Sequence, residues 1–73
     1  MKSYLVSHQS LPYGSIDVED GEVFFSNDAI SRFIRHRAKA DKVALVDYIA
    51  QLPRRLRGSW TVSVISEEER ALL

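Results

Sequence analysis

The sequence predicts a small α+β domain, an antiparallel sheet of about four strands in the element order β-β-β-α-α-β with two helices packed on one face. Two short alternating runs joined by Asp20-Gly21 indicate a β-hairpin, and a later alternating run indicates a further strand. Between them, apolar residues recur at helical spacing over two segments. With 73 residues, we expect one domain, residues 1–73, with little core to spare for a buried cleft.

The N-terminal segment is rich in residues that favour strands. Residues 2–8 (KSYLVSH) predict a first strand. The turn-forming residues that follow, including Pro12 and Gly14, predict a connection over residues 9–14. The second strand is therefore expected to begin near Ile16.

The Asp20-Gly21 pair determines the register of the hairpin, because Asp-Gly favours a two-residue turn. Glu19 then faces Glu22, and the pairs further from the turn follow in step. One side carries Ile16, Val18, Val23 and Phe25 and is suited to a core. The other side carries Phe24 and a set that we name the acidic face, which consists of Asp17, Glu19, Asp20 and Glu22.

Like charges opposed across a hairpin are destabilising, so the acidic face is expected to have a compensating group. Lys2 or an arginine, a divalent cation, or a basic partner could supply it. The cation fits least well, because an EF-hand loop has glycine at position 6, whereas Gly21 stands at position 5 counted from Asp17.

Two helices are expected after the hairpin. The first runs from about Asp28 to Lys39 after an N-cap at Ser26 or Asn27. The second covers residues 42–52, with Asp41 as its N-cap and Pro53 against its continuation. Their buried stripes are Ile30, Phe33, Ile34 and Ala38 in the first, and Leu45, Tyr48, Ile49 and Leu52 in the second. A single long helix, with Arg37 and Asp41 as an i, i+4 pair, stays open as the alternative.

The C-terminal segment predicts a strand and a short helix. Residues 59–65 alternate, with Trp60, Val62 and Val64 expected to face the core. Ser66 and Glu69 then have the spacing of a capping box, which favours a short helix at the end of the chain.

The charges are sorted along the chain, although its formal net charge is zero. Residues 32–57 hold eight of the ten Lys and Arg residues against two acids, a net charge of +6. Basic side chains fall at i, i+3, i+4 and i+7 on the first helix with no acid between them. We name this set the basic face; it consists of Arg32, Arg35, His36 and Lys39. A basic loop with Arg54, Arg55 and Arg57 could extend it, and the alternative is an ordinary solvated helix face.

Arg37 falls on the apolar side of the first helix. A buried guanidinium would need a partner such as Asp41, Asp47 or an acid of the hairpin. We expect instead that its stem lies along the edge of the core and that its charged head reaches water, as is common for long basic side chains.

No motif for catalysis, a cofactor or a metal accompanies these features. The chain has no cysteine, no nucleophile elbow and no glycine-rich phosphate loop, and His8 and His36 lack the spacing of a helical zinc site. The longest apolar run, residues 43–46, is far shorter than the ~18 residues of a membrane span. We therefore expect a cytoplasmic protein without enzymatic activity, cofactor, metal or membrane attachment.

The leading functional hypothesis is a small interaction protein, an inhibitor or adaptor, that binds a larger protein through the basic face and the arginine loop. A phage or mobile-element inhibitor of a host defence complex, a class that includes anti-CRISPR proteins, fits this size and the lack of catalytic groups. Nucleic-acid binding is the first alternative, with the basic face on phosphates and Trp60, Tyr13 or Phe24 stacking on bases.

Self-association as a homodimer is the second alternative. The acidic hairpin of one copy would then dock on the basic helix of another. The apolar residues outside the predicted stripes that could support such a contact are Phe24, Val43, Ile65, Leu72 and Leu73.

Overall fold

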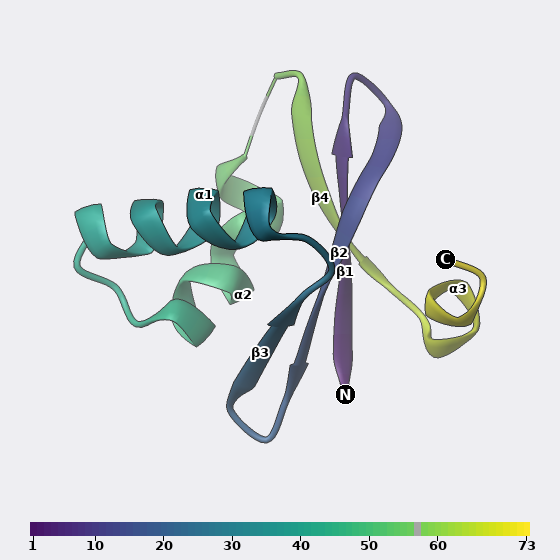
Figure 1. Ribbon diagram of the computed structural model, residues 1–73, viewed down its shortest axis with the longest axis horizontal. Coiled ribbons are helices and arrows are strands. Elements are labelled where there is room, and N and C mark those ends of the chain that lie inside the picture. Colours follow the sequence, from purple (N-terminus) through teal and green to yellow (C-terminus); the bar gives the residue numbers. More distant parts are fainter. Residues whose placement is uncertain (57) are drawn as a thin grey trace.

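A four-stranded antiparallel sheet forms the centre of the protein, with helices on both of its faces (Figure 1). The computed structural model describes residues 1–56 and 58–73. Its elements are β1 (Lys2–His8), β2 (Leu11–Glu19), β3 (Glu22–Phe25), α1 (Asp28–Ala40), α2 (Leu45–Arg55), β4 (Trp60–Ile65) and α3 (Glu67–Ala71). The strands lie in the order β3-β2-β1-β4. The predicted fold class is confirmed.

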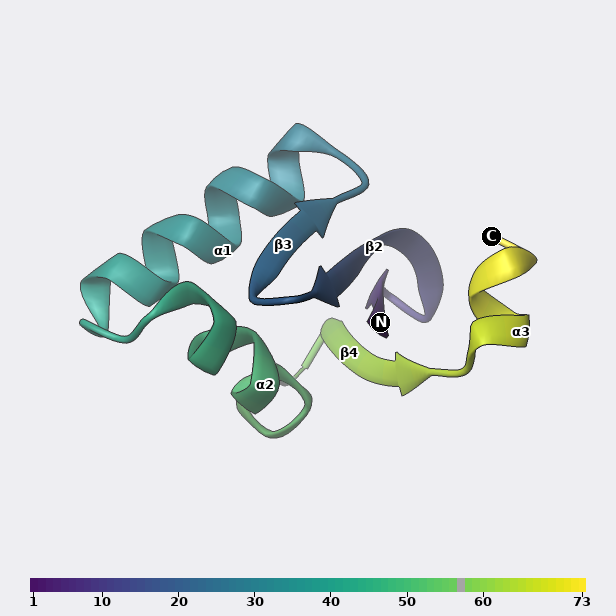
Figure 2. The same ribbon diagram turned by 90° about the horizontal axis from the view of Figure 1, so that it is seen from below.

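The long helices and the short one lie on opposite sides of the sheet. Figures 1 and 2 show α1 and α2 on one side, the inner face, and α3 alone on the other, the outer face. The predicted capping box is present in α3, where Glu69 N–H donates to Ser66 Oγ at 3.1 Å and Ser66 N–H donates to Glu69 Oε1 at 3.0 Å. Among residues 1–56 and 58–73, no helix combines the length and the apolar character needed to cross a bilayer.

The connection between β1 and β2 is shorter than the predicted turn over residues 9–14. Only Gln9 and Ser10 form it, with φ of 52° and 66°, and β2 already begins at Leu11. Pro12 has no N–H to donate, but β3 reaches no further along β2 than Ile16, so β2 has one neighbour at this end. Proline is tolerated at such an edge position, which explains why the turn prediction was wrong.

The second hairpin has the predicted register. Its Asp20-Gly21 turn has φ of 52° and 78°, as a two-residue turn of this kind requires. The pairs run from Glu19 opposite Glu22 to Ile16 opposite Phe25. The acidic face therefore lies on the outer face of the sheet, opposite the core.

The core lies between α1, α2 and the inner face of the sheet. Its largest fully buried side chains are Ile16, Ile34, Tyr48, Ile49 and Leu52. Two residues expected in the core are exposed instead, Phe33 to 38% and Val64 to 53%. Phe33 lies at the flank of the buried stripe of α1 and faces Trp60, whereas Val64 lies on an edge strand.

α1 and α2 are separate helices, as predicted, but Asp41 ends α1 instead of capping α2. Lys42 turns the chain with a φ of 57°. The Val43 N–H then bonds to the Ala38 carbonyl and the Lys42 N–H to the Lys39 carbonyl, both at 3.1 Å. This is the hydrogen-bond pattern of a Schellman motif, which excludes the single long helix.

α2 begins and ends three residues later than predicted. Its N-cap, Ala44, provides no side-chain hydrogen bond. Pro53 lies in the last turn, where its missing N–H removes one intrahelical bond, yet the Leu56 N–H still bonds to the Leu52 carbonyl at 3.0 Å. Burial of these leucines against the core outweighs the single bond lost at Pro53.

The start of α1 is tied directly to β2. Ser26 N–H donates to the Ser15 carbonyl at 3.0 Å, and Ser15 N–H donates to Ser26 Oγ at 2.8 Å. Asn27 Oδ1 caps the helix by accepting from the Ile30 N–H at 2.9 Å. A Cβ on Gly14 would lie 2.6 Å from Ile30 Cδ1 and from Ser26 Oγ, and 2.8 Å from Asn27 Nδ2. Gly14 therefore sets how closely α1 approaches the sheet.

Gly14→Ala is expected to destabilise the fold by about 1–3 kcal/mol, because overpacking forces buried neighbours to move. Urea unfolding measures this loss. The double variant Gly14→Ala, Ile30→Val lacks the clashing Cδ1 atom, so its loss should be smaller than the sum of the two single losses. Strictly additive losses would contradict the contact.

Lys42→Gly is expected to stabilise the protein by about 0.5–1 kcal/mol, because glycine adopts a positive φ without the steric cost of a Cβ. Thermal or urea unfolding checks it. Lys39→Gly is the matched control within the regular part of α1 and should instead lose about 1 kcal/mol. A loss in both variants would contradict the left-handed turn at Lys42.

Candidate functional site

The basic face lies on the side of α1 that points away from the core. All four of its residues are exposed. Arg35 is partly positioned, since its Nε donates to Ser31 Oγ at 3.1 Å and its guanidinium lies 5.3 Å from the ring centroid of Phe25. Within the described residues, no carboxylate forms an ion pair with any member of the basic face. The face therefore keeps its positive charge.

The three arginines of the predicted loop are not equivalent. Arg54 and Arg55 belong to α2, and Arg57 lies outside the described residues. Arg55 is held within the protein, because its guanidinium donates to Asp41 Oδ2 at 2.6 Å and to Gln51 Oε1 at 2.8 Å. Arg54 is exposed. The prediction of a basic loop is thus corrected to a helix end on which Arg55 already has a partner.

Asp17 is compensated by an arginine, one of the groups that the sequence left open. Arg70 of α3 donates from Nε to Oδ1 and from Nη2 to Oδ2, both at 3.1 Å, and Ser3 Oγ donates to Oδ1 at 2.7 Å. Burial raises the pKa of Asp17, but the hydrogen bonds from Arg70 and Ser3 and the charge of Arg70 lower this pKa by more, to below its ordinary value of 3.8. The same hydrogen bond and the charge of Asp17 raise the pKa of Arg70. This ion pair links α3 to the outer face.

The rest of the acidic face lies at the tip of the hairpin. Glu19, Asp20 and Glu22 are exposed, and Glu19 faces Glu22. No ion pair to these three occurs in the part of the chain that the structure describes. The acidic face therefore divides into one structural residue, Asp17, and a small surface patch that does not neutralise the basic face.

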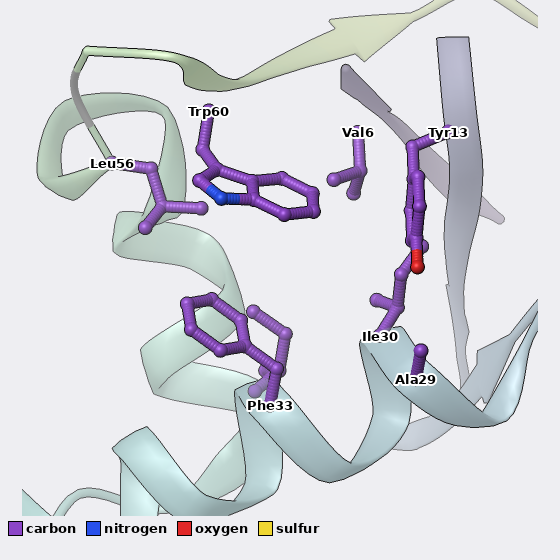
Figure 3. Close-up of a pocket in the computed structure, with 8 residues that line it drawn as sticks. Val6, Tyr13, Ala29, Ile30, Phe33, Leu56 and Trp60 are labelled. Carbon is purple, nitrogen blue, oxygen red and sulfur yellow. The ribbon is translucent and has the colours of Figure 1, made fainter. Parts of the chain in front are cut away.

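An apolar pocket of about 140 Å³ opens between the start of α1, the end of α2 and the inner face of the sheet (Figure 3). Trp60 contacts two of its walls, with ring centroids 5.9 Å from Phe33 and 5.2 Å from Tyr13. Figure 3 shows these three rings around the space, with Ala29 and Ile30 on the α1 side. We name it the aromatic pocket; its lining residues are Val6, Tyr13, Ala29, Ile30, Phe33, Ile34, Leu56 and Trp60.

The sequence pattern did not predict the aromatic pocket. Tyr13 falls in a segment predicted to be a turn, and the helical and strand patterns predict that Phe33 and Trp60 lie in the core. The only signal in the sequence is that Phe33 sits at the flank of its helical stripe, where a side chain can be half exposed. Arg37 lies beside it, exposed as expected, with its guanidinium 5.7 Å from the Phe33 ring centroid.

The two histidines lie in different surroundings. His8 packs on Trp60, with ring centroids 4.4 Å apart, and His36 belongs to the basic face. In the described part of the chain, no three His, Asp or Glu side chains are grouped closely enough to hold a metal ion.

The apolar residues considered for self-association do not form one cluster. Phe24 lies on β3 and Ile65 on β4, at opposite edges of the sheet. Val43 packs against the core on the inner face. Leu72 and Leu73 are exposed after α3.

Asp17→Asn is expected to lower the free energy of unfolding at neutral pH, because Arg70 loses its charged partner. The pKa of the Asp17 carboxyl in the folded protein lies below its ordinary value of 3.8, so the carboxylate stabilises the fold above pH 3.8. Its contribution to the free energy of unfolding is lost as the pH falls through the folded-state pKa. The difference between wild type and variant should therefore shrink below pH 3.8. Urea unfolding from neutral to acidic pH measures this difference, and a constant difference would argue against the ion pair.

Three surfaces are thus available for function in residues 1–56 and 58–73: the basic face, the acidic tip of the hairpin, and the aromatic pocket. Comparison with known protein families, curated proteins and solved structures found no match to this chain.

Proposed function

We propose that this protein is a non-enzymatic interaction protein, an inhibitor or adaptor, that binds a larger protein through the basic face of α1. One observation carries the proposal: in residues 1–56 and 58–73 no ion pair neutralises the basic face, although the chain has no net charge. The described ion pairs join Asp17 to Arg70 and Asp41 to Arg55, so these two acids serve other arginines. A carboxylate-rich protein surface would supply the missing counter-charge.

The energetics of α1 support this proposal. Like charges at i, i+3 and i+4 destabilise a helix by about 0.2–0.5 kcal/mol per pair, so grouping them on one face weakens the isolated protein. Carboxylates of a partner would reverse that effect, and the planar guanidinium groups of Arg32 and Arg35 can each bind a carboxylate through two hydrogen bonds. We place this interaction in the cytoplasm, since a chain without cysteine suits a reducing compartment.

Nucleic acid suits the same face less well. Trp60, the strongest candidate for base stacking, already packs on His8, Tyr13 and Phe33. The acidic tip of the hairpin and the glutamates of α3 would repel a long polyanion. A protein surface can present its carboxylates locally and avoid these groups.

Charge reversal tests the proposal. The partner is first recovered by affinity capture with the wild-type protein from the organism that encodes it, and we expect the double variant Arg32→Glu, Arg35→Glu to recover none of this partner. The affinity of the double variant for the purified partner should be lowered about tenfold or more. The variant should remain folded, because each new glutamate lies four residues before His36 or Lys39, in the favourable orientation. Circular dichroism verifies the fold.

The matched control is Lys2→Glu, Lys42→Glu, which changes the net charge equally but lies outside the basic face. It should retain the partner. Equal recovery with both double variants would remove the basic face from the mechanism, and recovery of a host defence complex would support the phage-inhibitor hypothesis. Binding to DNA with log affinity falling by about 0.9 per phosphate contact per log unit of salt would favour the nucleic-acid alternative instead.

A further inference from the structure

The aromatic pocket has the size of one side chain. Its volume is about 140 Å³, close to the ~150 Å³ cavity that holds a benzene molecule in another protein. Sites for cofactors and other multi-ring ligands are larger, about 300–1,000 Å³. A phenyl ring or a leucine side chain therefore matches the space.

The walls of the pocket are ordered before any ligand arrives. Trp60 packs on Tyr13, Phe33 and His8, so its ring position is determined by contacts inside the protein. Tyr13 nevertheless remains 45% exposed and Phe33 38% exposed. An apolar side chain entering here would bury aromatic surface without first ordering it, which lowers the entropic cost of binding. Aromatic residues in such arrangements commonly dominate protein interfaces.

The charge beside the pocket is positive. The guanidinium of Arg37 lies 5.7 Å from the centroid of the Phe33 ring that forms one wall. Successive residues of α1 are rotated by about 100° about the helix axis, which places His36 and Arg32 between Arg37 and the rest of the basic face. Asp28 lies about 180° round the helix from Arg37, on the side of Arg35 and Lys39, and forms no ion pair within the described residues. The pocket and the basic face therefore adjoin on one helix.

We infer that the aromatic pocket binds one aromatic or large aliphatic side chain of an acidic segment in a protein partner, whose flanking carboxylates meet Arg37 and the basic face. This inference deepens the proposed function and rests on it for the partner being a protein. The apolar residue would supply anchoring, whereas the carboxylates would select the segment and orient it.

Short peptides test the inference without the natural partner. The probe is a capped peptide with phenylalanine at its centre and Asp and Glu on both sides; one control has alanine at the centre and a second has lysines at the flanks. Because Trp60 is the only tryptophan, its fluorescence reports binding at the pocket, and amide chemical shifts locate the contact. We expect the alanine peptide to bind about 10- to 100-fold more weakly, and the lysine peptide about tenfold more weakly at low salt.

Filling the pocket should abolish binding. Ala29→Leu places a larger side chain at an exposed position that lines the pocket, and leucine is also a good helix former. Ala40→Leu is the matched control, exposed on the same helix about 16 Å away along its axis, and should bind like the wild type. Arg37→Gln should retain the preference for phenylalanine over alanine and reduce the preference for acidic over basic flanks.

Several results would overturn the inference: equal binding of the phenylalanine and alanine peptides, no effect of Ala29→Leu, or shift changes confined to the outer face. If, without peptide, the amide chemical shifts at the pocket changed with protein concentration, a second copy of the protein would fill the pocket instead. The two proposals can fail separately. If the peptide binds but reversal of Arg32 and Arg35 leaves partner capture unchanged, the basic-face proposal fails and the pocket stands.

Discussion

The close approach of α1 to β2 at Gly14 sets the geometry on which the functional surfaces depend. The absence of a side chain there lets Ser26 and Asn27 make their hydrogen bonds at the end of the hairpin. α1 then lies close enough to the sheet for Ile30 to pack into the core and for Phe33 to face Trp60. A helix lifted from the sheet would separate Phe33 from Trp60 and Tyr13, so the same contact that tightens the core also forms the aromatic pocket.

Charge segregation along the chain becomes a surface because the ion pairs are selective. Asp17 binds Arg70 across 53 positions of sequence, and Asp41 binds Arg55 at the ends of the two long helices. The first ion pair links α3 to the sheet, and the second links the end of α1 to the end of α2. Of the two arginines in these ion pairs, Arg55 belongs to the predicted site and Arg70 does not. Among the described residues, α1 therefore carries a set of cations that form no ion pair, on a rigid element next to the aromatic pocket.

Local rules were enough to predict most of the fold. The Asp-Gly turn determined the register of the second hairpin, and the Ser66 capping box identified α3. The errors occur where a tertiary contact overrides a local preference: Pro12 lies in a strand because its side of β2 has no neighbour, and Lys42 takes the place usually held by glycine. The basic face was visible in the sequence because it follows one helical period. The aromatic pocket was not, since its residues come from five separate segments and its existence depends on space left between them.

The two faces of the sheet carry separate tasks, which limits how binding can be coupled to the rest of the protein. The outer face holds α3 through polar groups, with Ser3 and Asp17 on adjacent strands and Arg70 above them. No residue of α3 lines the aromatic pocket, but β1 and β2 each contribute to both faces: Val6 and Tyr13 line the pocket, whereas Ser3 and Asp17 lie beneath α3. β4 also connects the two sides, because it carries Trp60 and α3 follows it in the chain. Displacement of α3 would therefore reach the pocket through the backbones of β1, β2 and β4, in which β1 is paired on one side with β2 and on the other with β4. A strand held in this way moves little, so the binding surface on α1 should keep its shape whether or not α3 is docked.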